Sequence, residues 1–166
     1  FRRVLFRSNT ASMAGLLTPP AMGIYNVSKH AVVALTETLY HDLDLIDAPI
    51  GVSVLCPYFV PTGISQSDGS RPADTKPTAP ATRSQQVSQA MLEKAVTSGK
   101  VSATEVAQIT FDAIRARQFY IYSHPQALGN VEQRMQDILH AHNPSDPYQN
   151  APKLRDQLRT ALRGDE

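Results

Sequence analysis

The fold is decided by the stretch Asn9-Thr10-Ala11-Ser12-Met13-Ala14-Gly15 together with Ile24-Tyr25-Asn26-Val27-Ser28-Lys29. Tyr25 and Lys29 are four residues apart, so a helix places a phenol and an ammonium on one face. A nearby positive charge favours the phenolate form of a tyrosine, which a free phenol reaches only near pH ~10. Ser12 adds a hydroxyl from a separate loop that can polarise an oxygen being protonated. The spacing therefore predicts an acid–base pair assisted by a serine.

A short apolar stretch, Gly51-Val52-Ser53-Val54-Leu55-Cys56, follows this helix in the sequence. Residues 52–56 are mostly aliphatic and β-branched, which is typical of a strand buried on both faces of a parallel sheet. The strand leads into Pro57-Tyr58-Phe59-Val60-Pro61-Thr62. A helix followed by a buried strand predicts an α/β fold.

Taken together, these motifs resemble the short-chain dehydrogenase/reductase family. The resemblance implies a Rossmann-like, doubly wound parallel sheet, NAD or NADP as cofactor, and hydride transfer between a ketone or aldehyde and a secondary alcohol. It further implies that Tyr25 is the general acid/base, that Lys29 binds the nicotinamide ribose, and that Ser12 orients the substrate carbonyl. These are the three expected catalytic residues, and Tyr25 and Lys29 also count as cofactor-binding.

The segment after the strand supplies the other expected binding residues. The family's motif at this place contacts the nicotinamide, and Pro57, Val60 and Thr62 match it. Tyr58 stands where the family usually has glycine, which removes conformational freedom from the turn and adds a ring beside the nicotinamide or substrate. The resemblance also implies that Met13, Tyr58 and Phe59 border the substrate.

The sequence lacks a glycine-rich phosphate-binding turn of the kind that follows the first strand of dinucleotide-binding folds. In the family that turn lies well upstream of the serine, and only eleven residues precede Ser12. We therefore expect the chain to be an N-terminally truncated part of the fold. Residues 1–8 hold three arginines in a span that the family keeps apolar, so we interpret them as a non-native or artefactual leader.

We expect residues 9–142 to form the C-terminal part of a Rossmann-type domain, and residues 143–166 an extension with an amphipathic helix. Residues 65–84 are rich in Ser, Pro and Thr, and the resemblance places the substrate lid there. The remaining patterns predict strand 119–122 and helices over about 23–44, 85–98, 128–139 and 153–163, with another helix after the capping box Ser102-Ala103-Thr104-Glu105.

The helix over 24–44 is the expected surface for a homodimer or homotetramer. Its apolar repeat includes Ile24, Val27 and Leu35, and a second apolar face contains Val32 and Val33. The resemblance assigns this second face to a partner subunit. An equally weighted alternative is that Val32 and Val33 simply face the sheet.

Composition narrows the function classes further. Sixteen basic against fifteen acidic residues give a net charge of +1 and no basic stripe, so nucleic acid is not an expected partner. No apolar run approaches the ~20 residues of a membrane span, and a single cysteine is typical of the reducing cytoplasm. The pair His140 and His142 has no further ligands in a zinc-like pattern, so we expect no metal.

Two alternatives stay open at this point. The chain could be a catalytically inactive fragment or a dimerising scaffold remnant, because the phosphate-binding turn is missing. Alternatively, the same scaffold could act on C=N or C=C bonds, or as an epimerase or dehydratase. The leading hypothesis remains an oxidoreductase with a small carbonyl or alcohol substrate.

Overall fold

The computed structural model describes residues 5–70, 72, 74 and 79–164. A parallel sheet of three strands, in the order β1-β2-β3, lies at its centre: β1 (Leu5–Thr10), β2 (Ile50–Cys56) and β3 (Tyr120–Tyr122). In the register, Leu5 pairs with Ile50, and Val54 pairs with Tyr120. The predicted α/β fold with a parallel sheet is confirmed.

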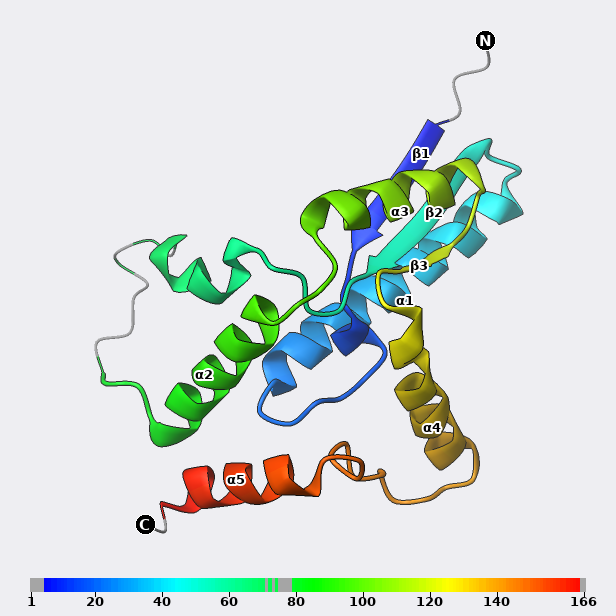
Figure 1. Ribbon diagram of the computed structural model, residues 1–166. Coiled ribbons are helices and arrows are strands. Elements are labelled where there is room, and N and C mark those ends of the chain that lie inside the picture. The colour runs from blue at the N-terminus through cyan, green and yellow to red at the C-terminus, as the bar shows by residue number, and fades with distance from the viewer. Residues whose placement is uncertain (1–4, 71, 73, 75–78, 165–166) are drawn as a thin grey trace. The chain divides into compact units, whose positions relative to one another are not determined.

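Helices cover both faces of this sheet. Between β1 and β2 runs α1 (Gly23–Leu45), and before β3 runs α3 (Ala103–Arg115). In Figure 1, α1 lies behind the strands and α3 in front of them. Each crossover leads to the next strand in the same direction across the sheet. Because α1 and α3 lie on opposite faces, the two crossovers have opposite handedness. The β1–α1–β2 crossover has the usual right hand, and the longer connection from β2 through α3 to β3 is left-handed.

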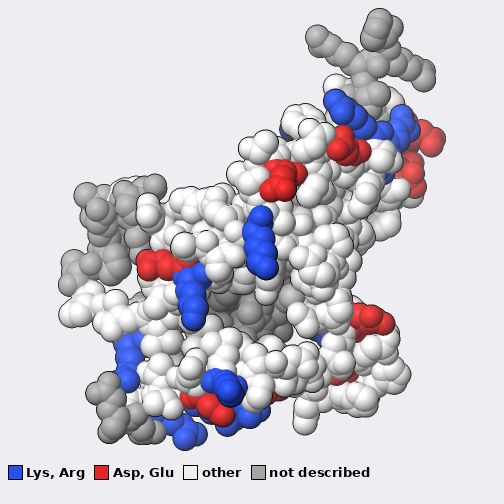
Figure 2. Space-filling model, in the orientation of Figure 1, with Lys and Arg blue, Asp and Glu red and all other residues white. Residues whose placement is uncertain are grey.

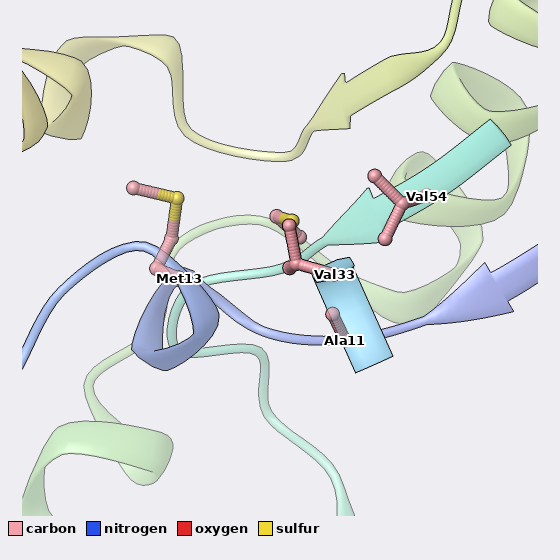
Figure 3. Packing of buried hydrophobic residues seen from close by; sticks show 5 residues of the cluster. Ala11, Met13, Val33 and Val54 are labelled. Carbon is pink, nitrogen blue, oxygen red and sulfur yellow. The ribbon is translucent and has the colours of Figure 1, made fainter. Parts of the chain in front are cut away.

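The core sits where α1 meets the carboxyl ends of β1 and β2. Its central cluster consists of Ala11, Met13, Val33, Val54 and Cys56. Figure 3 shows Val33 on α1 between Ala11 and Val54, with Met13 on the neighbouring 3₁₀ turn η1 (Met13–Gly15). Val54 and Cys56 are fully buried, as expected for a strand with helices on both sides.

The orientation of α1 corrects one interpretation of its apolar repeat. Val33 is 5% exposed, and Val32 packs against the same core cluster, so this face meets the sheet. Ile24, Val27 and Leu35 are instead 88%, 69% and 66% exposed. The helix carries two apolar faces, and the repeat alone does not say which of them the sheet covers.

The chain divides into two compact units. The sheet unit, residues 1–58 and 101–144, holds the three strands, α1 and α3 as well as η4 (Pro125–Ala127) and α4 (Leu128–Leu139). The helical unit, residues 59–100 and 145–166, holds η2 (Gly63–Ser70), α2 (Arg83–Thr97) and α5 (Pro152–Arg163). The helices and strands predicted from the sequence are present, and their ends lie within two residues of the expected ones.

Within the helical unit, α2 contacts both η2 and α5. The Gln89 side-chain amide donates to the Ser65 carbonyl at 2.7 Å, and the Arg83 guanidinium donates to the Ala161 carbonyl. The predicted extension thus packs on a helix some sixty residues earlier in the chain, a pairing that the sequence did not indicate.

Two predictions touch residues outside the described ranges. Residues 5–8 belong to β1, whereas residues 1–4 are not described, and the artefactual origin of the octet stays a prediction. The expected lid over 65–84 contains most of η2 and the first residues of α2, but residues 71, 73 and 75–78 lie outside the described part. The lid also stays a prediction.

Candidate active site

The candidate site lies at the carboxyl end of β1, where backbone pairing with β2 continues into the next loop. The amide of Ala11 donates to the Leu55 carbonyl at 2.8 Å, and the amide of Met13 donates to the Pro57 carbonyl at 2.9 Å. Ser12 lies between these two anchored residues. Its backbone position is therefore set by the end of the neighbouring strand.

The Ser12 hydroxyl has one firm contact and one long contact. It caps η1 by accepting from the Ala14 amide at 3.2 Å, and it donates to the Pro57 carbonyl at 3.4 Å. The second distance is longer than an ordinary O–H···O hydrogen bond of about 2.5–3.0 Å. A substrate oxygen could replace this weak contact while the capping contact keeps the side chain in place.

Tyr25 and Lys29 lie on the first turns of α1, with both residues half-buried. The Lys29 ammonium is 5.5 Å from the centre of the Tyr25 ring, and it donates to the Thr10 carbonyl at 3.4 Å. That carbonyl is two residues before Ser12. The predicted pair on one helix face is thus present, next to the strand end that leads to the serine.

Gly15 is a site residue that the sequence reasoning did not single out. A β-carbon at this position would lie 2.7 Å from the Lys29 carbonyl oxygen and 2.9 Å from Cγ2 of Val33. Only glycine lets η1 come this close to the backbone of α1. The close approach holds the turn that begins at Ser12 against the turn of α1 that carries Lys29.

Two asparagines fix the surroundings of the pair. The Asn9 amide donates to the Thr36 hydroxyl at 3.0 Å, tying the end of β1 to the middle of α1. The Asn26 amide donates to the Pro19 carbonyl at 3.0 Å and holds the loop before α1. Asn9 and Asn26 belong to the two stretches quoted at the start, but their spacing alone does not reveal these partners.

The other predicted site residues divide between the two units. Pro57 and Tyr58 belong to the sheet unit, and Phe59, Val60 and Thr62 belong to the helical unit. In the helical unit, the Thr62 hydroxyl accepts from the Ile64 amide at 3.4 Å, so it caps the start of η2. The cofactor role predicted for Pro57, Val60 and Thr62 therefore stays a prediction.

Met13 was expected to border the substrate, but its side chain is 1% exposed and lies in the core cluster (Figure 3). This burial gives Met13 a packing role in the described chain. The neighbouring thiol of Cys56 is also fully buried, and burial raises its pKa from 9.0 to about 11. Cys56 is therefore a neutral core residue at physiological pH.

Charged side chains are scattered over the face seen in Figure 2, and neither sign forms a continuous band there. Among the residues that the structure describes, no group of three His, Cys, Asp or Glu side chains could hold a metal ion. Within the same residues, every helix is too short or too polar to cross a lipid bilayer.

Known proteins are similar to this chain in sequence and in fold. Residues 8–73 match the family described as short chain dehydrogenase. A curated protein of Lactiplantibacillus plantarum, named CLA biosynthesis dehydrogenase/reductase, is 35% identical over 134 residues, which make up 79% of this chain and 46% of that protein. The chain belongs to the short-chain dehydrogenase/reductase family.

Solved structures of the short-chain dehydrogenase/reductase family agree with the assignment. A Burkholderia phymatum member in complex with NAD is 54% identical, with a TM-score of 0.84 over 86% of this chain and 50% of that one. A Sphingobium yanoikuyae short-chain dehydrogenase in complex with NADPH shares the fold at 17% identity and a TM-score of 0.50, over 84% of this chain and 46% of that one. The chain therefore spans about half the length of the relatives that it matches.

Proposed function

We propose that the protein containing this chain is an NAD(P)-dependent oxidoreductase that interconverts a ketone or aldehyde and an alcohol. The observation that carries the proposal is the contact of the serine-capped turn η1 with the turn of α1 that holds Lys29, beside Tyr25. The names of the relatives, each a dehydrogenase or reductase, support an oxidoreductase over an epimerase or an inactive remnant.

The donors at this site suit a nicotinamide cofactor. An ammonium offers three N–H donors, and one of those on Lys29 points to the Thr10 carbonyl. The remaining two suit the adjacent hydroxyls of a ribose, which is the role that the family resemblance implies for Lys29. When bound, the cofactor supplies or accepts the hydride, and the protein supplies orientation and electrostatics.

Tyr25 would donate the proton in reduction and accept it in oxidation. In the direction of reduction, its phenol gives a proton to the substrate oxygen as the carbon gains hydride, with the Lys29 ammonium 5.5 Å from the centre of its ring. Ser12 donates a hydrogen bond to the same oxygen in place of its long contact with the Pro57 carbonyl. In the direction of oxidation the same groups work in reverse, with the phenolate as base.

We also propose self-association through α1. The supporting observation is that Ile24, Val27 and Leu35 expose most of their apolar surface on this helix. This outer face replaces Val32 and Val33 as the expected contact surface. Placement in the cytoplasm stays a prediction, supported by the single cysteine, which is free and buried.

The decisive experiment replaces Tyr25 by phenylalanine in the complete protein, with Tyr40→Phe as the matched control on the same helix. Tyr40 is 46% exposed and its ring packs against Phe119. We expect Tyr25→Phe to lower kcat by about 100- to 10,000-fold, because the transferred proton loses its donor. Tyr40→Phe should leave kcat within about twofold.

The readout is the absorbance change of the nicotinamide with a panel of ketones and secondary alcohols. Binding of the reduced cofactor, followed by its fluorescence, should survive in the Tyr25→Phe variant. Near-normal turnover in Tyr25→Phe would overturn the role of Tyr25. Absence of nicotinamide-dependent turnover in the wild-type protein would overturn the proposed function itself.

A further inference from the structure

Ser123 and His124 form a buried polar pair that the proposed mechanism does not use. They follow β3, at the same edge of the sheet as the ends of β1 and β2, because all three strands are parallel. Ser123 is 4% exposed and His124 is 8% exposed. Polar side chains this deeply buried need partners, and their partners indicate what the pair holds in place.

Both side chains act on Tyr58. The backbone amide of Tyr58 donates to the Ser123 hydroxyl oxygen at 3.0 Å, and that oxygen is 2.8 Å from Nδ1 of His124. The rings of Tyr58 and His124 meet edge to face, with centroids 5.7 Å apart and planes at 63°. The end of β3 therefore holds both the backbone and the ring of Tyr58.

The Ser123 oxygen accepts from the Tyr58 amide, and a second hydrogen bond joins it to Nδ1 of His124, with the donor set by the tautomer of the imidazole. Removal of the Ser123 hydroxyl would leave the Tyr58 amide and the His124 ring nitrogen without this link. Tyr58 would lose this hydrogen bond to its backbone amide.

Tyr58 is joined to the site of Ser12 through its chain neighbour Pro57. The Pro57 carbonyl accepts from the Ser12 hydroxyl at 3.4 Å and from the Met13 amide at 2.9 Å. The Tyr58 ring is 41% exposed, so part of it remains accessible beside the strand end that positions Ser12. A ring that packs against His124 and is partly open to solvent can form one wall of a binding site.

We propose that Tyr58 is a specificity-determining residue that favours substrates with a flat apolar group next to the reacting carbon, and that Ser123 and His124 are its positioning residues. The inference rests on the proposed function and adds a substrate class to it. An aromatic ring fixed edge to face presents an uncharged surface to which flat groups bind well. A fixed ring also loses less conformational freedom on binding than a mobile one.

The test compares two ketones, acetophenone and butanone, in the complete protein. Tyr58→Ala should lower kcat/KM for acetophenone about tenfold or more relative to butanone, whereas Tyr58→Phe keeps the ring and the wild-type ratio. Ser123→Ala should shift the ratio in the same direction by about threefold. Equal effects of Tyr58→Ala on both ketones, or no effect on either, would overturn the proposal.

Ser53→Ala is the matched control for Ser123→Ala. Ser53 is equally buried, at 1% exposed, and its hydroxyl donates to the Gln118 carbonyl at 2.6 Å near the opposite end of the strands. Ser53→Ala removes one buried hydrogen bond and Ser123→Ala removes two, so both should lower the melting temperature. Only Ser123→Ala should change the ketone ratio, and a change of the same size in Ser53→Ala would assign the shift to general destabilisation and overturn the positioning role.

A binding measurement separates this proposal from the function on which it rests. In protein labelled at tyrosine, addition of acetophenone should shift the ring resonances of Tyr58, identified by their loss in Tyr58→Phe. A shift without nicotinamide-dependent turnover would refute the oxidoreductase function but support the substrate contact of Tyr58. Turnover of acetophenone without a shift at Tyr58 would refute that contact but support the oxidoreductase function.

Discussion

The sheet unit and the helical unit differ sharply in how much they bury. Among the described residues, the helical unit has one buried apolar residue, Val96, and the other buried apolar side chains all belong to the sheet unit. The buried polar residues, Ser123 and His124 among them, are likewise in the sheet unit. Yet the two units contain helices with the same kind of cap, at Ser102 and at Thr82.

This difference matches the tasks that we propose for the two parts. Proton transfer needs fixed geometry, and Ser12, Tyr25 and Lys29 are on the densely packed unit. The predicted lid is in the sparsely packed unit, where few buried contacts oppose local opening. The residues proposed for proton transfer therefore differ from the predicted lid in the packing density of their unit as well as in sequence position.

The largest expected effect is a loss of stability at alkaline pH, which arises in the core of the sheet unit. Burial raises the pKa of Cys56 from 9.0 to about 11, so the unfolded chain loses this proton first as the pH rises. Stability is fully present below pH 9 and falls between pH 9 and 11, by about 3 kcal/mol in total. Urea unfolding followed by circular dichroism from pH 8 to 11 measures it.

Cys56→Ala is the control for this fall. In the variant, the loss should begin only near pH 10, the usual pKa of a phenol, because partial burial raises the pKa values of Tyr58 and Tyr122 from 10.0. An unchanged curve between pH 9 and 10 would rule out Cys56 as the cause.

Low pH should destabilise the helical unit instead. Asp146 accepts from the Tyr148 amide and pairs with Arg155, each at 2.9 Å, which lowers the pKa of its carboxyl below 3.8. Its stabilising contribution is present above that pH and is lost as the pH falls further. Hydrogen exchange of peptides from 145–164 should therefore increase selectively in acid, and Asp146→Asn should remove this selectivity.

The next largest loss of stability is expected from shortening one buried valine in each unit. Val54→Ala in β2 removes methyl groups from a fully buried site, and we expect a loss of about 2 kcal/mol in the free energy of unfolding. Val96→Ala in α2 should cost about 1 kcal/mol, because a small core can close around the cavity. Equal losses in denaturant unfolding would show that the two units are equally well packed.

The smallest expected effect uses the two capping boxes. Ser102 accepts from the Glu105 amide at 3.2 Å, and Thr82 accepts from the Gln85 amide at 3.3 Å. Ser102→Ala should lower global stability by about 1 kcal/mol. Thr82→Ala should change global stability by less than about 0.5 kcal/mol and instead speed amide exchange within α2. Identical global effects would mean that both units unfold in one cooperative step.

Local features were predictable from the sequence because they depend on near neighbours in the chain. The pairing of Tyr25 with Lys29 follows from helical spacing, and β2 follows from its aliphatic, β-branched run. The capping box at Ser102 was recognised, whereas Thr82 with Gln85 was missed, although Gln fills the same role as Glu in that motif.

Features that join distant segments were not predictable in this way. The covered face of α1, the packing of α5 on α2, and the burial of Met13 each depend on residues far away in the sequence. No role for His124 followed from the sequence, because its contact with Tyr58 spans more than sixty residues. Even Gly15 looks like an ordinary loop glycine until the Lys29 carbonyl is placed beside it.

By itself, the sequence indicated the helices, the strands after the first, and the residue types of the proposed proton-transfer site, since periodicity and spacing act over a few residues. The tertiary structure alone decided which helix face is covered, which polar groups are buried and which side chains hold the turn that begins at Ser12. The physical reason is that burial and close contact are properties of surfaces brought together by folding. No short stretch of chain contains both of those surfaces.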